Sequence, residues 1–146
     1  MEILHRLRNE GRAHDMQALA ESIPYARSLG LRVEPRGNEL TTIMPFQDSL
    51  IGNVRLPALH GGALGALLEF CILFQLVFDD AGERLPKTID ISIDYLRSGR
   101  PMDSYARAEV VRRGRRVANV RAQVWQDERE RPIAAAHGNF LLQSLV

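Results

Sequence analysis

The sequence predicts an α+β fold in which a mainly antiparallel sheet wraps around one long buried helix. The first observation is an apolar run from Ala63 to Phe78, whose only polar side chains are Glu69 and Gln75. A helix that is apolar almost all round has to be covered by other elements on every side. The second observation is that four strand-like segments follow this run and can supply the covering sheet.

The composition is that of an ordinary globular protein. Of the 146 residues, 45% are hydrophobic and 25% are charged, which predicts one sizeable core. The net charge of +1 gives no general attraction for nucleic acid. The charged N-terminal segment lacks the apolar centre of a secretion signal. The lone cysteine, Cys71, cannot form an internal disulfide, which is typical of the reducing cytoplasm.

The apolar run is a poor match to a membrane span. It is shorter than the roughly 20 apolar residues that a bilayer requires, and it contains a glutamate. We therefore expect a cytoplasmic protein without a membrane or nucleic-acid partner.

Residues 1–28 are predicted to form one or two helices. Asp15 is a candidate N-cap, Pro24 should kink or divide the segment, and Gly30 should stop it. We interpret 1–28 as a helical N-terminal extension and 29–146 as the main domain.

Periodicity assigns the remaining elements. Residues 31–46 predict two short strands around a turn at Pro35–Asn38, and residues 53–59 an irregular approach to a helix over residues 60–79. Residues 81–86 are predicted to form a turn. In TIDISIDYL, Ile89, Ile91, Ile93 and Tyr95 alternate with polar residues, which predicts a strand with one buried face. SYARAEVV, VANVRAQVW and IAAAHGNFLL predict three more strands, separated by turns at RRGRR and QDERERP.

His60, Gly61 and Gly62 open the long helix. Unshielded backbone N–H groups at a helix start can hold an anion or a developing oxyanion. The alternative is a tight turn where only glycine fits.

Glu69 is a costly residue in an apolar run unless it is paired or chemically useful. It lies nine residues after His60, which on one straight helix means about 13.5 Å and roughly 180° around the axis. If both residues serve one reaction, a second chain has to supply one of them. The alternative is a core glutamate paired with an arginine.

Other polar residues give weaker signals. The cluster Arg112, Arg113, Arg115 and Arg116, with Arg97 and Arg100 nearby in sequence, either binds phosphate or forms a solvated hairpin tip. The four histidines, His5, His14, His60 and His137, have no metal-ligand spacing, so we expect no metal. Cys71 is interpreted as core packing. Phe46, Phe70, Phe74 and Phe78 either line an aromatic or medium-chain pocket or belong to the core.

Over about residues 30–143 the chain resembles the hotdog-fold acyl-CoA thioesterases, in particular the phenylacetyl-CoA (PaaI-like) branch. LHGGALGALLE is similar to the family's histidine-glycine-glycine opening with an acid nine residues on. TIDISIDYLRSGRP resembles the strand after the central helix, and AEVVRRGRRVANVRAQVWQDERERPIAAAHGNFLL resembles the last three strands.

The resemblance implies a role for each residue. Glu69 takes the place of the general base or nucleophile, the Gly61 amide polarises the thioester carbonyl, and His60 orients the motif. Thr88 matches a position that holds the attacking water. Asn53 stands seven residues before His60, where the family often has asparagine six before, and the acid is glutamate where this branch usually has aspartate. The four arginines of residues 112–116 (Arg112, Arg113, Arg115 and Arg116) would lie near the CoA phosphates.

The sequence thus predicts a cofactor-independent acyl-CoA thioesterase. We expect a homodimer with shared active sites, or a tetramer of two such dimers. The alternatives are a hotdog 3-hydroxyacyl thioester dehydratase and a non-catalytic acyl-CoA-binding protein.

Overall fold

The computed structural model describes residues 2–145, which form four α-helices and eight strands. The helices are α1 (Glu2–Asn9), α2 (Met16–Ser22), α3 (Pro24–Ser28) and α4 (Gly61–Asp79), with a 3-10 turn at Asp48–Leu50. The strands are β1 (Arg32–Arg36), β2 (Glu39–Met44), β3 (Ile51–Asn53), β4 (Ala58–Leu59), β5 (Arg84–Tyr95), β6 (Ser104–Arg113), β7 (Val117–Trp125) and β8 (Ala134–Ser144).

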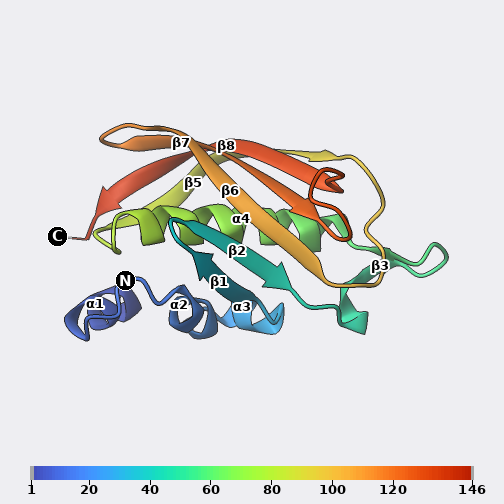
Figure 1. Ribbon diagram of the computed structural model, residues 1–146, viewed down its shortest axis with the longest axis horizontal. Helices are drawn as coiled ribbons and strands as arrows, with labels where there is room; N and C mark the ends of the chain where they lie inside the picture. The colour runs from blue at the N-terminus through green and yellow to red at the C-terminus, as the bar shows by residue number, and fades with distance from the viewer. Residues whose placement is uncertain (1, 146) are drawn as a thin grey trace.

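The predicted architecture is confirmed: an antiparallel sheet wraps around α4 (Figure 1). The strand order is β1-β2-β6-β7-β8-β5, and every neighbouring pair is antiparallel. Strands β3 and β4 form a separate two-stranded sheet just before α4. Helix α4 contacts five strands of the large sheet, which explains why its sequence is apolar almost all round.

Helix α4 is the core of the fold and not a membrane span. Its length and mean hydropathy of 1.9 would allow it to cross a bilayer, but 56% of that window is buried inside the protein. Leu67, Leu68 and Ile72 are completely buried. Truncating such side chains to alanine typically costs about 2–5 kcal/mol of stability.

The N-terminal region contains three helices, where the sequence predicted one or two. The additional break lies after Asn9, where Gly11 adopts a φ of 71° that favours glycine. The prediction that Asp15 is an N-cap is confirmed, since its carboxylate accepts the N–H of Ala18 at 2.9 Å. Pro24 begins α3, and Gly30 ends the segment with a φ of 67°.

Strand β5 corrects the prediction of one buried face. Ile91 and Ile93 are half-buried, but Ile89 and Tyr95 are each 55% exposed. Two features explain the difference: β5 is an edge strand of the sheet, and its pairing with β8 shifts between Thr88 and Asp90. The shift breaks the period of two at Ile89, and the edge position of β5 leaves Tyr95 uncovered on one side.

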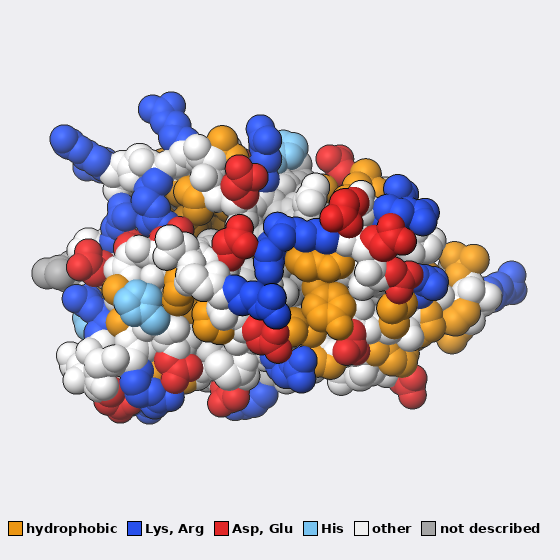
Figure 2. Space-filling view, viewed as in Figure 1, with side chains coloured by type: hydrophobic (Ala, Val, Ile, Leu, Met, Phe, Trp, Pro, Cys, Tyr) orange, Lys and Arg blue, Asp and Glu red, His pale blue; other side chains and the backbone are white. Residues whose placement is uncertain are grey.

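The residues before α4 are also more ordered than predicted. Residues 53–59 were expected to be irregular, but β3 and β4 form a small hairpin around them. The loop of this hairpin projects at one end of the molecule (Figure 2) and exposes Val54 and Leu56.

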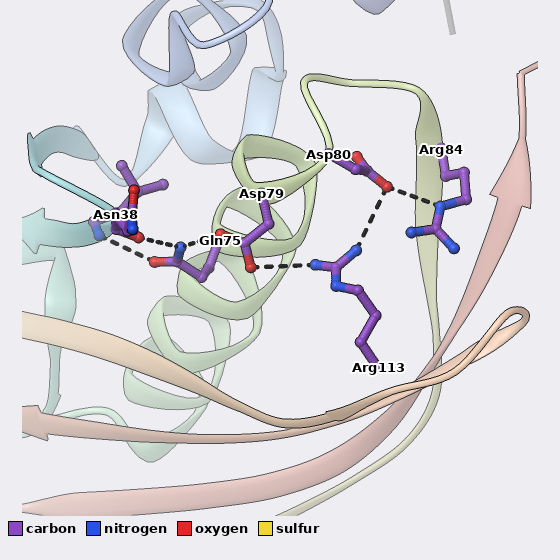
Figure 3. Close-up of polar contacts among 7 residues, drawn as sticks. Asn38, Gln75, Asp79, Asp80, Arg84 and Arg113 are labelled. Carbon is purple, nitrogen blue, oxygen red and sulfur yellow. Dashed lines mark hydrogen bonds and ion pairs between the residues drawn. The ribbon is translucent and has the colours of Figure 1, made fainter.

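A polar network fixes the far end of α4 (Figure 3). Gln75 accepts the N–H of Leu40 at 3.0 Å and donates to the Asn38 carbonyl at 2.9 Å and to Asp79 at 2.7 Å. This explains the second polar residue of the apolar run: it holds the β1–β2 turn against the helix. Arg113 extends the network to the β6–β7 hairpin through ion pairs with Asp79 and Asp80.

Candidate active site

The first turn of α4 is capped by the histidine that precedes it. His60 Nδ1 accepts the N–H of Gly62 at 2.8 Å. The ring therefore carries its proton on Nε2 when neutral. The N–H of Gly61 occupies the first helical position, which has no intrahelical acceptor, and it donates no hydrogen bond to any group within residues 2–145. One N–H at the helix start is thus satisfied, and the neighbouring one is available.

The glycines of this turn are required by close packing. A Cβ at Gly62 would lie 2.9 Å from His60 Nδ1, in the path of the capping bond. A Cβ at Gly52 in β3 would lie 2.7 Å from His60 Cα. The capping geometry of His60 therefore depends on glycine on both sides.

Tyr95 is a residue of this site that the sequence reasoning missed. Its hydroxyl donates to the Gly61 carbonyl at 2.8 Å, and a Cβ at Gly61 would lie 3.2 Å from its ring. Ile93 packs on Gly65 in the same way, since a Cβ at Gly65 would lie 3.0 Å from the Cδ1 of Ile93. Together these side chains of β5 hold the start of α4. The available signal was the period-two pattern, which placed both on one face of β5.

Glu69 lies on the part of α4 that this chain does not cover. It is half-buried, and no hydrogen bond or ion pair from any described residue reaches its carboxylate. Gly62, Ala66 and Leu73 share its side of the helix and are exposed or half-buried as well. We call these four residues the open strip of α4. The alternative for Glu69 was a core glutamate paired with an arginine of the same chain. No such pair is found among residues 2–145.

His60 and Glu69 are not brought together within one chain. Glu69 is the eighth residue after Gly61 in the helix, which corresponds to about 12 Å along the axis. A site that uses both has to combine two chains, as the sequence spacing indicated.

Asn53 and Thr88 lie on different elements, and within residues 2–145 neither forms a hydrogen bond with His60 or Glu69. Asn53 Oδ1 accepts the N–H groups of Arg55 at 3.1 Å and Leu56 at 3.4 Å, and so closes the β3–β4 loop. Thr88 is half-buried in β5, opposite Phe140, at the point where the strand register shifts.

The arginines of residues 112–116 lie at the opposite end of α4. Arg113 is held by Asp79 and Asp80 at 3.2 and 3.5 Å, whereas Arg112, Arg115 and Arg116 are exposed. Figure 2 shows basic side chains projecting from the end of the molecule where Figure 1 places the β6–β7 hairpin. The length of α4 separates this hairpin from His60 by about 28 Å.

Arg97 and Arg100, near this cluster in sequence, are far from it in the fold. With Arg131 they line a cleft of about 370 Å³. The segment that carries them lies beside the start of α4, since the N–H of Leu59 donates to the Gly99 carbonyl at 2.9 Å. Arg100 is ion-paired with Asp127. The chain thus has two separate groups of arginines, one at each end of α4.

Cys71 takes no part in the open strip. It is completely buried, and burial raises the pKa of its thiol to about 12. The thiol therefore stays protonated at neutral pH and is not a nucleophile. No group of His, Cys, Asp or Glu suited to hold a metal occurs in the described part of the chain.

Comparison with known proteins gives the family. The model of the thioesterase superfamily matches residues 56–133, more than half of the 146 residues. The medium/long-chain acyl-CoA thioesterase YigI of Salmonella typhimurium is 30% identical over 135 residues, which cover 82% of this chain and 86% of that protein. A crystal structure from Chromobacterium violaceum is 33% identical and aligns over 100% of both chains with a TM-score of 0.74.

A more distant structure agrees in fold. The E. coli PaaI protein is 17% identical, with a TM-score of 0.75 over 90% of this chain and 96% of that one. These matches confirm the resemblance on which the sequence analysis relied. The chain therefore belongs to the thioesterase superfamily and is a thioester hydrolase with the hotdog fold.

Proposed function

We propose that the chain hydrolyses acyl-CoA thioesters to a carboxylic acid and free CoA, at sites shared between two chains. The observation that carries the proposal is the half-buried, unpaired carboxylate of Glu69 on an otherwise apolar helix. A lone carboxylate there costs stability, and catalysis gives it a use.

In this mechanism the thioester carbonyl oxygen lies against the start of α4. Attack on the carbonyl carbon moves negative charge onto this oxygen, and the available N–H of Gly61 donates to it. His60 acts on the same turn by capping Gly62. Fixed donors of this kind stabilise the charge as it develops, without reorganisation.

Glu69 of the other chain then activates the nucleophile. As a general base it takes a proton from water while the oxygen of that water bonds to the carbonyl carbon. The C–S bond breaks, and the CoA thiolate recovers the proton. As a nucleophile the Glu69 carboxylate instead attacks the carbonyl carbon, the C–S bond breaks and CoA thiolate leaves, and water then hydrolyses the resulting mixed anhydride to the acid and free Glu69. Thr88 holds the water, and Asn53 supports the motif through the β3–β4 loop.

The edge of the sheet supports the second chain. β5 has a neighbour on only one side, and it carries the exposed side chains of Ile89 and Tyr95, followed by Leu96. An uncovered apolar edge is a template for strand pairing. Beside β5 lies the open strip with Glu69, so one interface would cover both. Two such dimers could pair into a tetramer.

The substrate and its anchor follow from the relatives and from charge. The YigI proteins are named for medium- and long-chain acyl-CoA, and we propose this class here. Arg112, Arg115 and Arg116 bind the CoA phosphates, whereas Arg113 supports their hairpin through Asp79.

We place the enzyme in the cytoplasm, where its lone cysteine needs no partner.

The test of this proposal is Glu69→Gln. Glutamine keeps the shape of the side chain but can neither accept the proton nor attack. We expect a folded protein whose kcat on its best acyl-CoA falls by roughly 10²–10⁴-fold at nearly unchanged KM. Glu69→Asp should keep part of the activity, since the carboxylate remains. A folded Glu69→Gln protein with wild-type kcat would remove Glu69 from the mechanism.

A further inference from the structure

An apolar slot lies between the N-terminal helices, α4 and the start of β5. Every side chain that lines it is apolar, and its volume is about 180 Å³. Ile3, Leu19 and Ile23 form one wall, and Phe70 and Leu73 of α4 form the opposite wall. Figure 1 shows these helices on the side of α4 that faces away from β5–β8. One wall of the slot thus comes from residues that precede the matched family region, 56–133.

The slot begins where the open strip of α4 ends. Leu73 belongs to both, one helical turn after Glu69 and on the same side of the helix. Phe70 follows Glu69 directly and lines the slot. An extended chain that starts near Glu69 can therefore run over Leu73 into the slot without crossing a polar group.

The depth of the slot is suited to an apolar ligand. Leu19 and Phe74 at its floor are 5% and 1% exposed, whereas Ile3, Ile23 and Leu73 at its rim are half-buried. An apolar cavity of about 150 Å³ stays dry and binds benzene. By that measure, 180 Å³ holds roughly seven carbon atoms.

Aromatic stacking fixes one side of the slot. Phe70 stacks on Phe74 with ring centroids 5.6 Å apart, and Tyr25 packs on Phe70 at 6.0 Å. These contacts connect the N-terminal helices to α4, so that the slot has a set width. Phe70 and Phe74 were among the aromatic residues for which the sequence left pocket and core open.

We propose that this slot holds the distal carbons of the acyl chain, and that α1 and α2 thereby set the chain length that the enzyme prefers. The inference rests on the proposed acyl-CoA hydrolysis. Short acyl groups leave the slot empty, whereas medium chains fill it. Because each buried methylene strengthens binding about fourfold, filling the slot favours longer chains strongly in kcat/KM.

The experiment narrows the slot and compares chain lengths. We measure kcat/KM of the wild-type enzyme and of Ile23→Trp on butyryl-, octanoyl- and dodecanoyl-CoA. Exclusion of three methylenes should lower kcat/KM on the longer substrates roughly 60-fold, with butyryl-CoA hydrolysed at the wild-type rate. Val111→Trp, at an exposed apolar position outside the slot, is the matched control and should keep the wild-type profile.

A second variant widens the slot. Ile3→Ala should raise the preference for dodecanoyl- over octanoyl-CoA, and it keeps the test decisive if Ile23→Trp does not fold. Equal losses on all three substrates, or an unchanged profile in both folded variants, would overturn the slot as the acyl site while leaving hydrolysis itself intact. A wild-type enzyme that hydrolyses none of the three would instead overturn the proposed function, and the slot proposal with it.

Discussion

The start of α4 shows how single residues create the candidate site. The HGG motif and Glu69 stand out in the sequence because glycine pairs and a carboxylate are costly in an apolar helix. Tyr95 does not, because its role depends on a contact with Gly61, 34 residues away. The chemistry of single residues predicts which side chains are unusual for their position. Only the fold shows which other side chains, such as Tyr95, keep them in place.

Tyr95→Phe tests this positioning role. The variant loses the hydrogen bond to the Gly61 carbonyl but keeps the ring that packs on the glycine. We expect a loss of about 1 kcal/mol in unfolding free energy. If the bond orients the Gly61 N–H, kcat should also fall while KM stays constant.

The matched control is Tyr25→Phe, which removes a hydroxyl from an exposed tyrosine. Denaturant unfolding and steady-state kinetics on both variants separate the two roles. A Tyr95→Phe protein that is less stable but turns over at the wild-type rate would make Tyr95 purely structural.

At the scale of elements, the sequence predicted which segments are helices and strands better than it predicted irregularities within a strand. Helix α4 and the strands follow from periodicity, but the irregularity in β5 does not. There, β8 approaches so closely that a Cβ at Gly138 would lie 2.3 Å from the Asp90 carbonyl, and Asn139 donates to the Asp90 carboxylate at 3.2 Å. A register shift depends on both strands, so the pattern of one strand cannot reveal it.

Helix α2 carries a cap that can be tested through pH. The Asp15 carboxylate accepts the N–H of Ala18 and forms an ion pair with Arg12. Both contacts lower the pKa of this carboxyl below its ordinary value of 3.8. A lowered folded-state pKa stabilises the protein above the unfolded-state value, and the stabilisation is lost as the pH falls through the folded-state value.

Asp15→Ala should therefore cost about 1 kcal/mol at neutral pH, and the difference from wild type should shrink as the pH falls below 3.8. Thermal unfolding across this range measures it, and Glu21→Ala, at the other end of α2, serves as the control. A difference that is independent of pH would mean that the charge of Asp15 does not contribute.

For the whole molecule, the direction of β5 decides how the two chains would meet in the proposed dimer. β5 starts beside the end of α4, where Arg84 pairs with Asp80 at 2.9 Å, and ends beside its start, where Tyr95 reaches Gly61. Antiparallel pairing of two β5 edges about a two-fold axis therefore turns the two α4 helices in opposite directions. The hairpin arginines of one chain then lie at the end where the other chain's α4 begins.

This arrangement predicts which arginines bind CoA. Replacing Arg112, Arg115 and Arg116 by alanine should raise KM roughly tenfold, at about 0.2–1 kcal/mol for each ion pair, with kcat nearly constant. Replacement of Arg97, Arg100 and Arg131 by alanine is the matched control, because these arginines line the cleft at the other end of α4 in the same chain. The opposite outcome, a raised KM only in the control, would place the CoA phosphates in that cleft.

The shared site itself can be tested by mixing two inactive variants. Glu69→Gln removes the carboxylate, and His60→Ala removes the cap of α4; each homodimer should be nearly inactive. In a hybrid dimer one site contains the intact Glu69 of one chain and the intact His60 of the other. Random exchange makes half of the dimers hybrids, so activity should recover to about a quarter of the wild-type value. The variants are unfolded and refolded together, and kcat on the best acyl-CoA is compared with that of each variant refolded alone. A site built within one chain would gain nothing from mixing, because no chain in the mixture carries both residues.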